Sequence, residues 1–156
     1  MRIEVDDLTR PAVLELLNEH LANMYAVTPP EHVFALDVAK LRAPDITFWT
    51  AWDGNVLLGC GALRELSPTH GELKSMRTPQ ALRRRGAGRA LLAHMIGVAR
   101  TRGYELLSLE TGSHPAFGPA RALYASAGFS RCGPFGAYEE NPSSVFMSLR
   151  LAPGAA

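Results

Sequence analysis

A chain of 156 residues with 47% hydrophobic residues can bury the core of one ordinary domain. Its 16 lysines and arginines nearly balance its 15 aspartates and glutamates, so it lacks the basic excess that dedicated nucleic-acid binders show. We expect no signal peptide, because the first residues are charged, and no apolar run approaches the about 20 residues that a membrane span needs. The two cysteines, Cys60 and Cys132, have no metal-ligand spacing. We therefore expect a cytoplasmic protein without a metal.

The N-terminal third predicts one strand and two helices. Residues 2–5 alternate between apolar and polar, which is typical of a strand. Apolar residues at helical spacing follow, with Thr9 as the predicted N-cap and Pro11 in the first turn. After a loop at 28–32, a second short helix is predicted, and it ends before Pro44.

The middle of the chain predicts three strands of an antiparallel meander. Residues 46–53 and 56–66 form a hairpin through a Gly-Asn turn, and residues 71–78 add the third strand. A helix then follows an arginine- and glycine-rich stretch and ends at Gly103.

The last third predicts a buried strand at 104–111, a helix at 115–128 and two final strands. The order β-α-α-β-β-β-α-β-α-β-β indicates a mixed sheet with helices on its faces, which is an α/β (α+β) fold. We expect one domain over residues 1–152 and a flexible tail at 153–156.

The stretch RRRGAGRALL, Arg83 to Leu92, combines three arginines with two glycines at the start of a predicted helix. The free backbone N–H groups of a helix start attract anions, and glycines let an anion approach the main chain. An exposed basic helix start is an equally good reading of this stretch alone. A Walker loop is excluded because no G-K-[ST] follows, and a dinucleotide-binding fingerprint would need a third glycine.

The wider segment ELKSMRTPQALRRRGAGRALLAHMIGVARTRG resembles the acetyl-CoA-binding motif of the GNAT family of N-acetyltransferases. The motif is matched as Arg83-x-x-Gly86-x-Gly88, with Arg84 where relatives often have glycine. A second family landmark, a Leu-Tyr pair followed by Gly-Phe, is matched by ALYASAGF. The resemblance extends over residues 46–150. GELKSMRT, LSLETGS and ALYASAGF together are similar to a group of small bacterial acetyltransferases.

The resemblance implies a mostly antiparallel sheet in which the strands at 71–78 and 104–111 splay apart to admit acetyl-CoA as cosubstrate. It implies that the pantetheine arm follows the backbone of Met76, Arg77 and Thr78, and that Arg121 meets the phosphates. The residues around which the pyrophosphate would lie are Arg83, Arg84, Arg85, Gly86, Ala87, Gly88 and Arg89. A solvated helix position is an equal reading of Arg121, and a core position is an equal reading of the Met76 side chain.

For catalysis, the resemblance implies Tyr124 as the proton donor to the leaving thiolate. Many relatives have a glutamate on the central strand, so Glu72 is the predicted general base, with a salt-bridged or solvated strand residue as the alternative. Strand alternation predicts that Glu72, Lys74 and Met76 share one face. Lys74 would then pair with Glu72 or bind an acidic substrate.

The predicted acceptor-binding residues are Lys74, Thr111, Tyr138 and His32. The leading hypothesis is an enzyme that transfers acetyl from acetyl-CoA to an amine in a ternary complex, because no cysteine lies in the landmarks as an acyl carrier. A non-catalytic acyl-CoA sensor or scaffold is the alternative, as is an acetyltransferase that acts on protein amines. We expect a small-molecule amine or amino acid as acceptor, no nucleic acid or membrane partner, and a possible homodimer.

Overall fold

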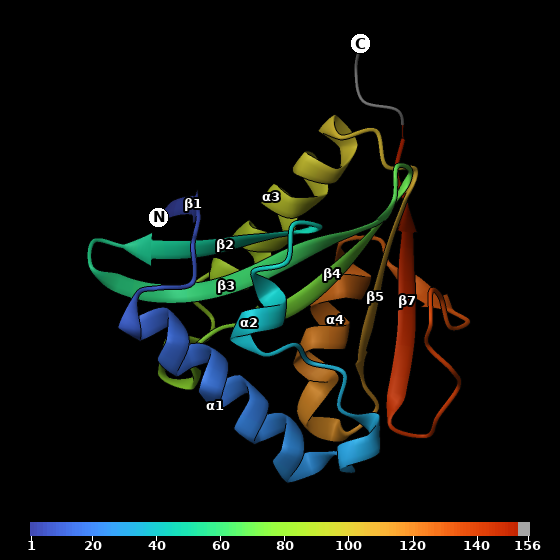
Figure 1. Cartoon of the computed structure of the whole chain (residues 1–156), viewed down its shortest axis with the longest axis horizontal. Helices are drawn as coiled ribbons and strands as arrows, with labels where there is room; N and C mark the ends of the chain where they lie inside the picture. Colours follow the sequence, from blue (N-terminus) through green and yellow to red (C-terminus); the bar gives the residue numbers. More distant parts are fainter. Residues whose placement is uncertain (153–156) are drawn as a thin grey trace.

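Within residues 1–152, which the computed structural model describes, seven strands form one sheet in the order β1-β2-β3-β4-β5-β7-β6 (Figure 1). All neighbouring strands are antiparallel except β4 and β5, which are parallel. The strands are β1 (Arg2–Val5), β2 (Ile46–Asp53), β3 (Val56–Ser67), β4 (His70–Arg77), β5 (Leu106–Gly112), β6 (Ser130–Cys132) and β7 (Ser144–Arg150). The predicted fold class, a mixed and mostly antiparallel sheet flanked by helices, is confirmed. The expected flexible tail, 153–156, lies outside the described residues.

Four α-helices and three short 3-10 turns connect the strands in the described part of the chain. The helices are α1 (Pro11–Val27), α2 (Val38–Leu41), α3 (Ala87–Thr101) and α4 (Gly118–Ser126), and the turns are η1 (Pro30–His32), η2 (Gln80–Leu82) and η3 (Pro115–Phe117). The predicted cap of α1 is one residue off. Arg10 holds the N-cap position, and the Thr9 hydroxyl instead donates to Asp7. No helix among these residues is long and apolar enough to cross a bilayer.

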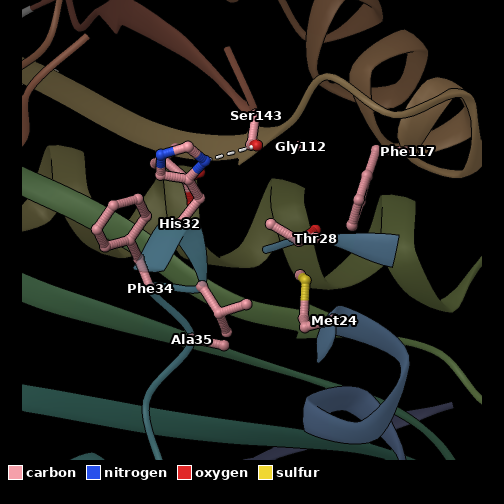
Figure 2. Close-up of a pocket in the computed structure, with 10 residues that line it drawn as sticks. Met24, Thr28, His32, Phe34, Ala35, Gly112, Phe117 and Ser143 are labelled. Atoms are coloured by element: carbon pink, nitrogen blue, oxygen red, sulfur yellow. Dashed lines mark hydrogen bonds between the residues drawn. The ribbon is translucent and has the colours of Figure 1, made fainter. Parts of the chain in front are cut away.

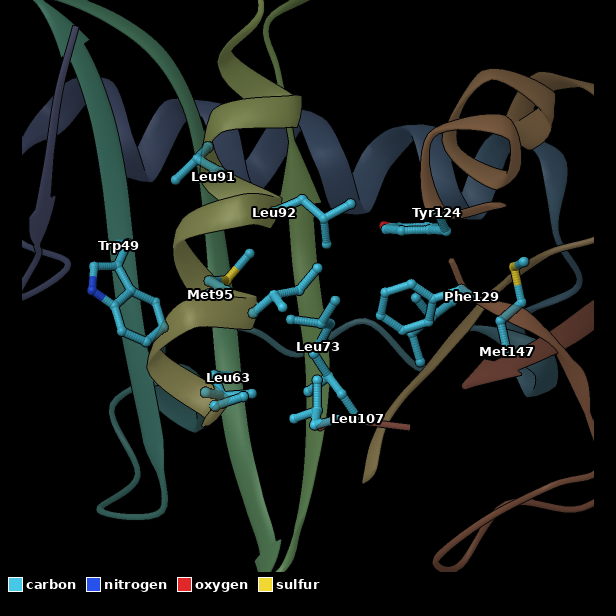
Figure 3. Close-up of a cluster of buried hydrophobic side chains, with 14 of the residues drawn as sticks. Trp49, Leu63, Leu73, Leu91, Leu92, Met95, Leu107, Tyr124, Phe129 and Met147 are labelled. Carbon is cyan, nitrogen blue, oxygen red and sulfur yellow. The ribbon is translucent and has the colours of Figure 1, made fainter. Parts of the chain in front are cut away.

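Helices cover both faces of the sheet, and each face has its own apolar core. Helices α3 and α4 lie behind the sheet in Figure 1, whereas α1 and α2 lie in front. Behind the sheet, Leu91 and Met95 of α3 pack against Leu63 and Leu73, and Tyr124 of α4 joins the same cluster (Figure 3). In front, leucines of α1 and α2 pack against β2 and β3. Burial of these two apolar surfaces drives the fold.

The parallel strands β4 and β5 separate halfway along their length. Their pairing runs from His70 opposite Leu106 to Leu73 opposite Leu109 and then stops. Beyond that point β4 continues beside β3 as far as Arg77, and β5 continues beside β7. We call this opening the β4–β5 split.

A bulge in β4 accompanies the split. Ser75 has a left-handed φ of 55°, and β4 carries one extra residue opposite the step from Cys60 to Ala62. A bulge of this kind moves the following side chains to the other face of a sheet. The prediction that Met76 shares a face with Glu72 and Lys74 is therefore wrong. Met76 packs into the core behind the sheet, which agrees with the alternative that its side chain is a core residue.

Candidate functional site

The start of α3 lies on one side of the β4–β5 split, next to Thr78 just after β4, and it offers free backbone donors. The first helical bond of α3 runs from the Ala90 amide to the Gly86 carbonyl, at 2.9 Å. The amides of the three residues between them therefore have no partner within the helix. Gly86 is the N-cap, with a left-handed φ of 81°, and no side chain caps the helix. These amides fit a phosphate group, because they add to the partial positive charge of a helix N-terminus.

Four arginines surround this helix start and are exposed: Arg83, Arg84, Arg85 and Arg89. None of them forms an ion pair within residues 1–152. Arg84 has a left-handed φ of 68°, a conformation that favours glycine. Gly88 differs from Gly86, because it has no positive φ, and a Cβ there would make only an ordinary contact, 3.4 Å from Leu123. The backbone geometry of the loop thus depends on Gly86 more than on Gly88.

On the other face of the sheet, just before the split, Glu72 is buried and hydrogen-bonded in the part of β4 that still pairs with β5. The carboxylate is part of a residue that is only 2% exposed, and its Oε2 accepts from the Tyr138 hydroxyl at 2.6 Å and from Lys74 Nζ at 3.1 Å. Lys74 Nζ also donates to the Tyr138 oxygen at 2.9 Å. Burial raises the pKa of Tyr138, and the charge of Glu72 raises it further. Glu72 is therefore paired with Lys74, as predicted, and is not solvated.

Glu110 is a second carboxylate at the split, and the sequence-based interpretation missed it. It lies on β5 beyond the last residue paired with β4, and its Oε2 accepts from the Ser144 hydroxyl at 2.7 Å. Burial raises the pKa of Glu110, while the Ser144 bond and the charge of Lys74 oppose that effect. The available signal was a single acidic residue inside the apolar strand LLSLETG.

A pocket lies in front of this end of the sheet (Figure 2). Its walls are Met24 and Thr28, residues 32–35, Glu110 and Gly112 at the end of β5, Phe117 and Ser143. His32 Nδ1 and the Ser143 hydroxyl are 2.8 Å apart and join two segments that are 111 residues apart in sequence. We call this cavity the His32 pocket.

The structure brings some of the predicted acceptor residues together and separates others. His32 lines the pocket, and the Tyr138 ring stacks edge-on against Phe34, another lining residue, at 5.2 Å. Thr111 does not line it, although its neighbours Glu110 and Gly112 do, because successive side chains of a strand point to opposite faces. Lys74 is absent from the lining as well, since its amine is held by Glu72 and Tyr138.

Tyr124 approaches the split from α4. Its residue is 7% exposed, and its ring packs edge-on against Phe129 with centroids 5.9 Å apart (Figure 3). Within the described chain its hydroxyl makes no hydrogen bond. Burial raises the pKa of Tyr124, and the charge of Glu110 adds to the effect. The phenol therefore keeps its proton at neutral pH.

The remaining predicted cofactor residues have structural partners. Arg121 Nη1 donates to the carbonyls of Gly112 and His114, at 2.6 and 3.1 Å, and so holds the loop between β5 and α4. The Arg77 side chain forms an ion pair with Glu19 at 2.8 Å. Contacts of Arg121 and of the β4 backbone with a coenzyme stay predictions. Among residues 1–152 no cluster of histidine, cysteine or carboxylate groups could hold a metal ion.

Comparison with known proteins adds independent evidence. Residues 11–129 match the model of the acetyltransferase (GNAT) family. An uncharacterized N-acetyltransferase of Bacillus subtilis, YsnE, is 54% identical over 151 residues, which cover 97% of this chain and all of that protein.

Solved structures give the same result for the fold. A Klebsiella pneumoniae protein assigned as an acyl-CoA N-acyltransferase superposes with a TM-score of 0.78 at 25% identity, covering 97% of each chain. An aminoglycoside 6'-N-acetyltransferase in complex with coenzyme A superposes with a TM-score of 0.72 at 17% identity, covering all of both chains. The chain belongs to the GNAT family of acyl-CoA-dependent N-acetyltransferases.

Proposed function

We propose that this enzyme moves an acetyl group from acetyl-CoA to the amine of a small molecule by direct attack in a ternary complex. The observation that carries the proposal is the β4–β5 split, which has free helix amides on one side and a pocket with one carboxylate, that of Glu110, on the other. A coenzyme with an anionic end and an amine acceptor can approach the split from these two sides.

The residues that would hold acetyl-CoA are the amides of Ala87, Gly88 and Arg89, helped by the nearby guanidinium groups. The backbone of β4 beyond the bulge, Met76 to Thr78, would hold the pantetheine arm. When bound, the coenzyme supplies an activated thioester. The acceptor would enter through the His32 pocket. One protein of similar fold is an aminoglycoside 6'-N-acetyltransferase in complex with coenzyme A, and a small-molecule acceptor of that kind agrees with this choice.

Two proton transfers are needed. A primary amine with a pKa of about 10.4 is neutral in only about one molecule in a few thousand at pH 7, so a nearby group must accept its proton. The leaving thiolate, with a pKa of about 8.5, needs a donor. Tyr124 is suited to that role, since its phenol is protonated at neutral pH and its hydroxyl is free of other described partners.

The test is thiol release from acetyl-CoA in the presence of a panel of amines. We expect turnover with at least one small amine, and a loss of about 10- to 100-fold in kcat for Tyr124→Phe, because the phenylalanine keeps the packing against Phe129 but cannot donate a proton. Tyr25→Phe is the matched control, because Tyr25 is 56% exposed. Tight binding of CoA without turnover of any acceptor would instead support the sensor or scaffold.

A further inference from the structure

We propose that Glu110, rather than Glu72, accepts the proton of the acceptor amine, and that the acceptor is an amine with an apolar body and no carboxylate. This inference rests on the proposed function and names its base and its substrate class.

The first argument is that Glu72 is already occupied. Its Oε2 is bonded to both Tyr138 and Lys74, and the residue is 2% exposed. A proton taken up by this carboxylate would break its ion pair with a lysine whose side chain is only 7% exposed. Leaving such a lysine without its counter-charge is costly. Glu72 is therefore a positioning residue, which fixes Tyr138 beside the pocket.

The second argument is the place of Glu110. It lines the His32 pocket, whereas Glu72 does not. Its one side-chain bond within residues 1–152 comes from the neutral Ser144 hydroxyl to Oε2, so Oε1 is available to an acceptor. Because burial raises the pKa of this carboxyl, it holds a proton more strongly than an exposed glutamate would. A base with a raised pKa is better matched to removing a proton near neutral pH.

The third argument concerns the rest of the pocket. Met24, Phe34 and Phe117 supply an apolar surface with two aromatic rings, seen around the cavity in Figure 2. No lysine or arginine is among the described lining residues, and His32 is engaged with Ser143. An acceptor carboxylate would lie near Glu110 without a counter-ion, which is unfavourable. The cavity itself is small, about 20 Å³, which suits an ammonium group beside Glu110 while the apolar body of the acceptor lies against the rings that border it.

The chemistry balances. The ammonium group gives one proton to the Glu110 carboxylate, and the neutral nitrogen then forms a bond to the acyl carbon while the carbon–sulfur bond breaks. After the bond has formed, the nitrogen loses its second proton to solvent, and the Tyr124 phenolate, which has protonated the leaving thiolate, takes one proton back from solvent. Glu110 later releases its proton to solvent, so the products are an amide, free CoA and one proton.

Matched acceptor pairs test the substrate class. Thiol release from acetyl-CoA is measured with phenethylamine against phenylalanine, tyramine against tyrosine, and tryptamine against tryptophan. We expect kcat/KM to be at least about tenfold higher for the amine of each pair, because the amino acid brings an unpaired carboxylate into the pocket. Equal or better use of the amino acids overturns this part of the proposal.

Variants test the base on whichever acceptor the wild type uses. Glu110→Gln should lower kcat about 100-fold or more at pH 7 with CoA affinity unchanged, whereas Glu105→Gln, at an exposed position just before β5, should leave kcat as it is. The kcat of Glu110→Gln should rise about tenfold per pH unit toward the pKa of the amine. Charged or titratable groups around Glu110 are Glu72 and Lys74 on β4, Tyr124 on α4, His32 and Tyr138.

Glu72→Gln should retain the pH profile of the wild type, because Glu72 is not the group that titrates in catalysis. A wild-type kcat and pH profile for Glu110→Gln, in an enzyme that turns over some amine, overturns the base assignment and leaves the proposed function standing. No turnover of any amine by the wild type overturns the proposed function, and this inference with it.

Discussion

The two sides of the β4–β5 split use different parts of the protein, the main chain on one side and side chains on the other. On the α3 side, the features that matter belong to the main chain, namely free amides and a left-handed glycine within a few consecutive residues. On the pocket side, they are side chains brought together from distant segments, such as Tyr138 on Glu72 and Ser144 on Glu110. The first side is exposed and the second is largely buried.

This difference teaches that the two sides tolerate change differently. A backbone site loses function when a residue blocks access or alters φ, while most of its side chains contribute little to folding. A site of buried, bonded side chains loses stability when one partner is removed, because the other is left desolvated. Four predictions test this contrast, taken from the largest expected effect to the smallest.

The largest effect is expected for Lys74→Met on the pocket side. The variant leaves the Glu72 carboxylate buried without its counter-charge, which should lower the free energy of unfolding by about 3–5 kcal/mol. Arg64→Met is the matched control, because the Arg64–Asp45 pair has side chains that are 42% and 43% exposed. It should cost no more than about 1 kcal/mol.

Urea unfolding of both variants measures the difference. Adding Glu72→Gln to Lys74→Met should recover part of the lost stability, because no unpaired charge then remains buried. Equal losses for Lys74→Met and Arg64→Met would mean that the pocket side is no more dependent on its ion pair than the surface is.

How far the sequence predicts each side follows from the same contrast. Gly86 and the amides after it occupy one short segment, so a local pattern was sufficient to identify them. The pair of Glu72 and Tyr138 is 66 residues apart, and the pair of His32 and Ser143 is 111 residues apart. No spacing in a single sequence identifies such partners. The pocket residues were therefore named only in part, with Glu110 missed.

The placement of Met76 failed for a related reason. Strict alternation along β4 requires a regular strand, and nothing in SMRT indicates that Ser75 has a positive φ. Serine is not a residue that favours the left-handed region, so the bulge is set by the surrounding sheet. The strands and helices themselves were predictable, because their hydrophobic periods and their glycine and proline boundaries are local.

The second prediction concerns the α3 side. Gly86→Glu places a carboxylate at the helix start where the coenzyme phosphates would bind, and it forces a non-glycine residue into φ 81°. We expect CoA affinity to fall about 100-fold, equivalent to about 3 kcal/mol. Gly97→Glu makes the same change in charge at an exposed position of the same helix and should leave affinity within about twofold.

Calorimetric titration with CoA measures both variants. An unchanged affinity for Gly86→Glu would show that the coenzyme does not use this helix start. It would also contradict the statement that the α3 side is a binding site made by the main chain.

The third prediction is a pH dependence that comes from a buried histidine of α1, the helix in front of the sheet (Figure 1). His20 of α1 is 7% exposed, its Nδ1 has no described partner, and burial lowers its pKa from 6.5 to about 4. Between these values the unfolded chain binds more protons than the folded one, so stability falls as the pH falls. From pH 7.5 to 5 this histidine should cost about 2 kcal/mol of unfolding free energy.

His20→Leu removes the titrating group and keeps an apolar side chain in its place. Unfolding in urea at pH 7.5 and 5 should therefore show a smaller pH-dependent loss for the variant than for the wild type, by that amount. If the two proteins lose the same free energy, the histidine is not held neutral by burial.

The smallest effect should come from Arg84, and its sign should be the opposite of the others. Arg84 has a φ of 68°, and this conformation costs a non-glycine residue about 1–2 kcal/mol. Glycine avoids that cost, but it makes the unfolded chain more flexible, which lowers the free energy of unfolding by about 0.5–1 kcal/mol. Arg84→Gly should therefore stabilise the protein by about 0.5–1 kcal/mol. Arg85→Gly, whose position has no positive φ, should destabilise it slightly. Thermal unfolding of the two variants measures the difference. Each variant loses one exposed arginine, so the difference between them reports the effect of the backbone conformation alone. A loss of stability in both variants would show that the arginine side chains contribute to folding on the α3 side.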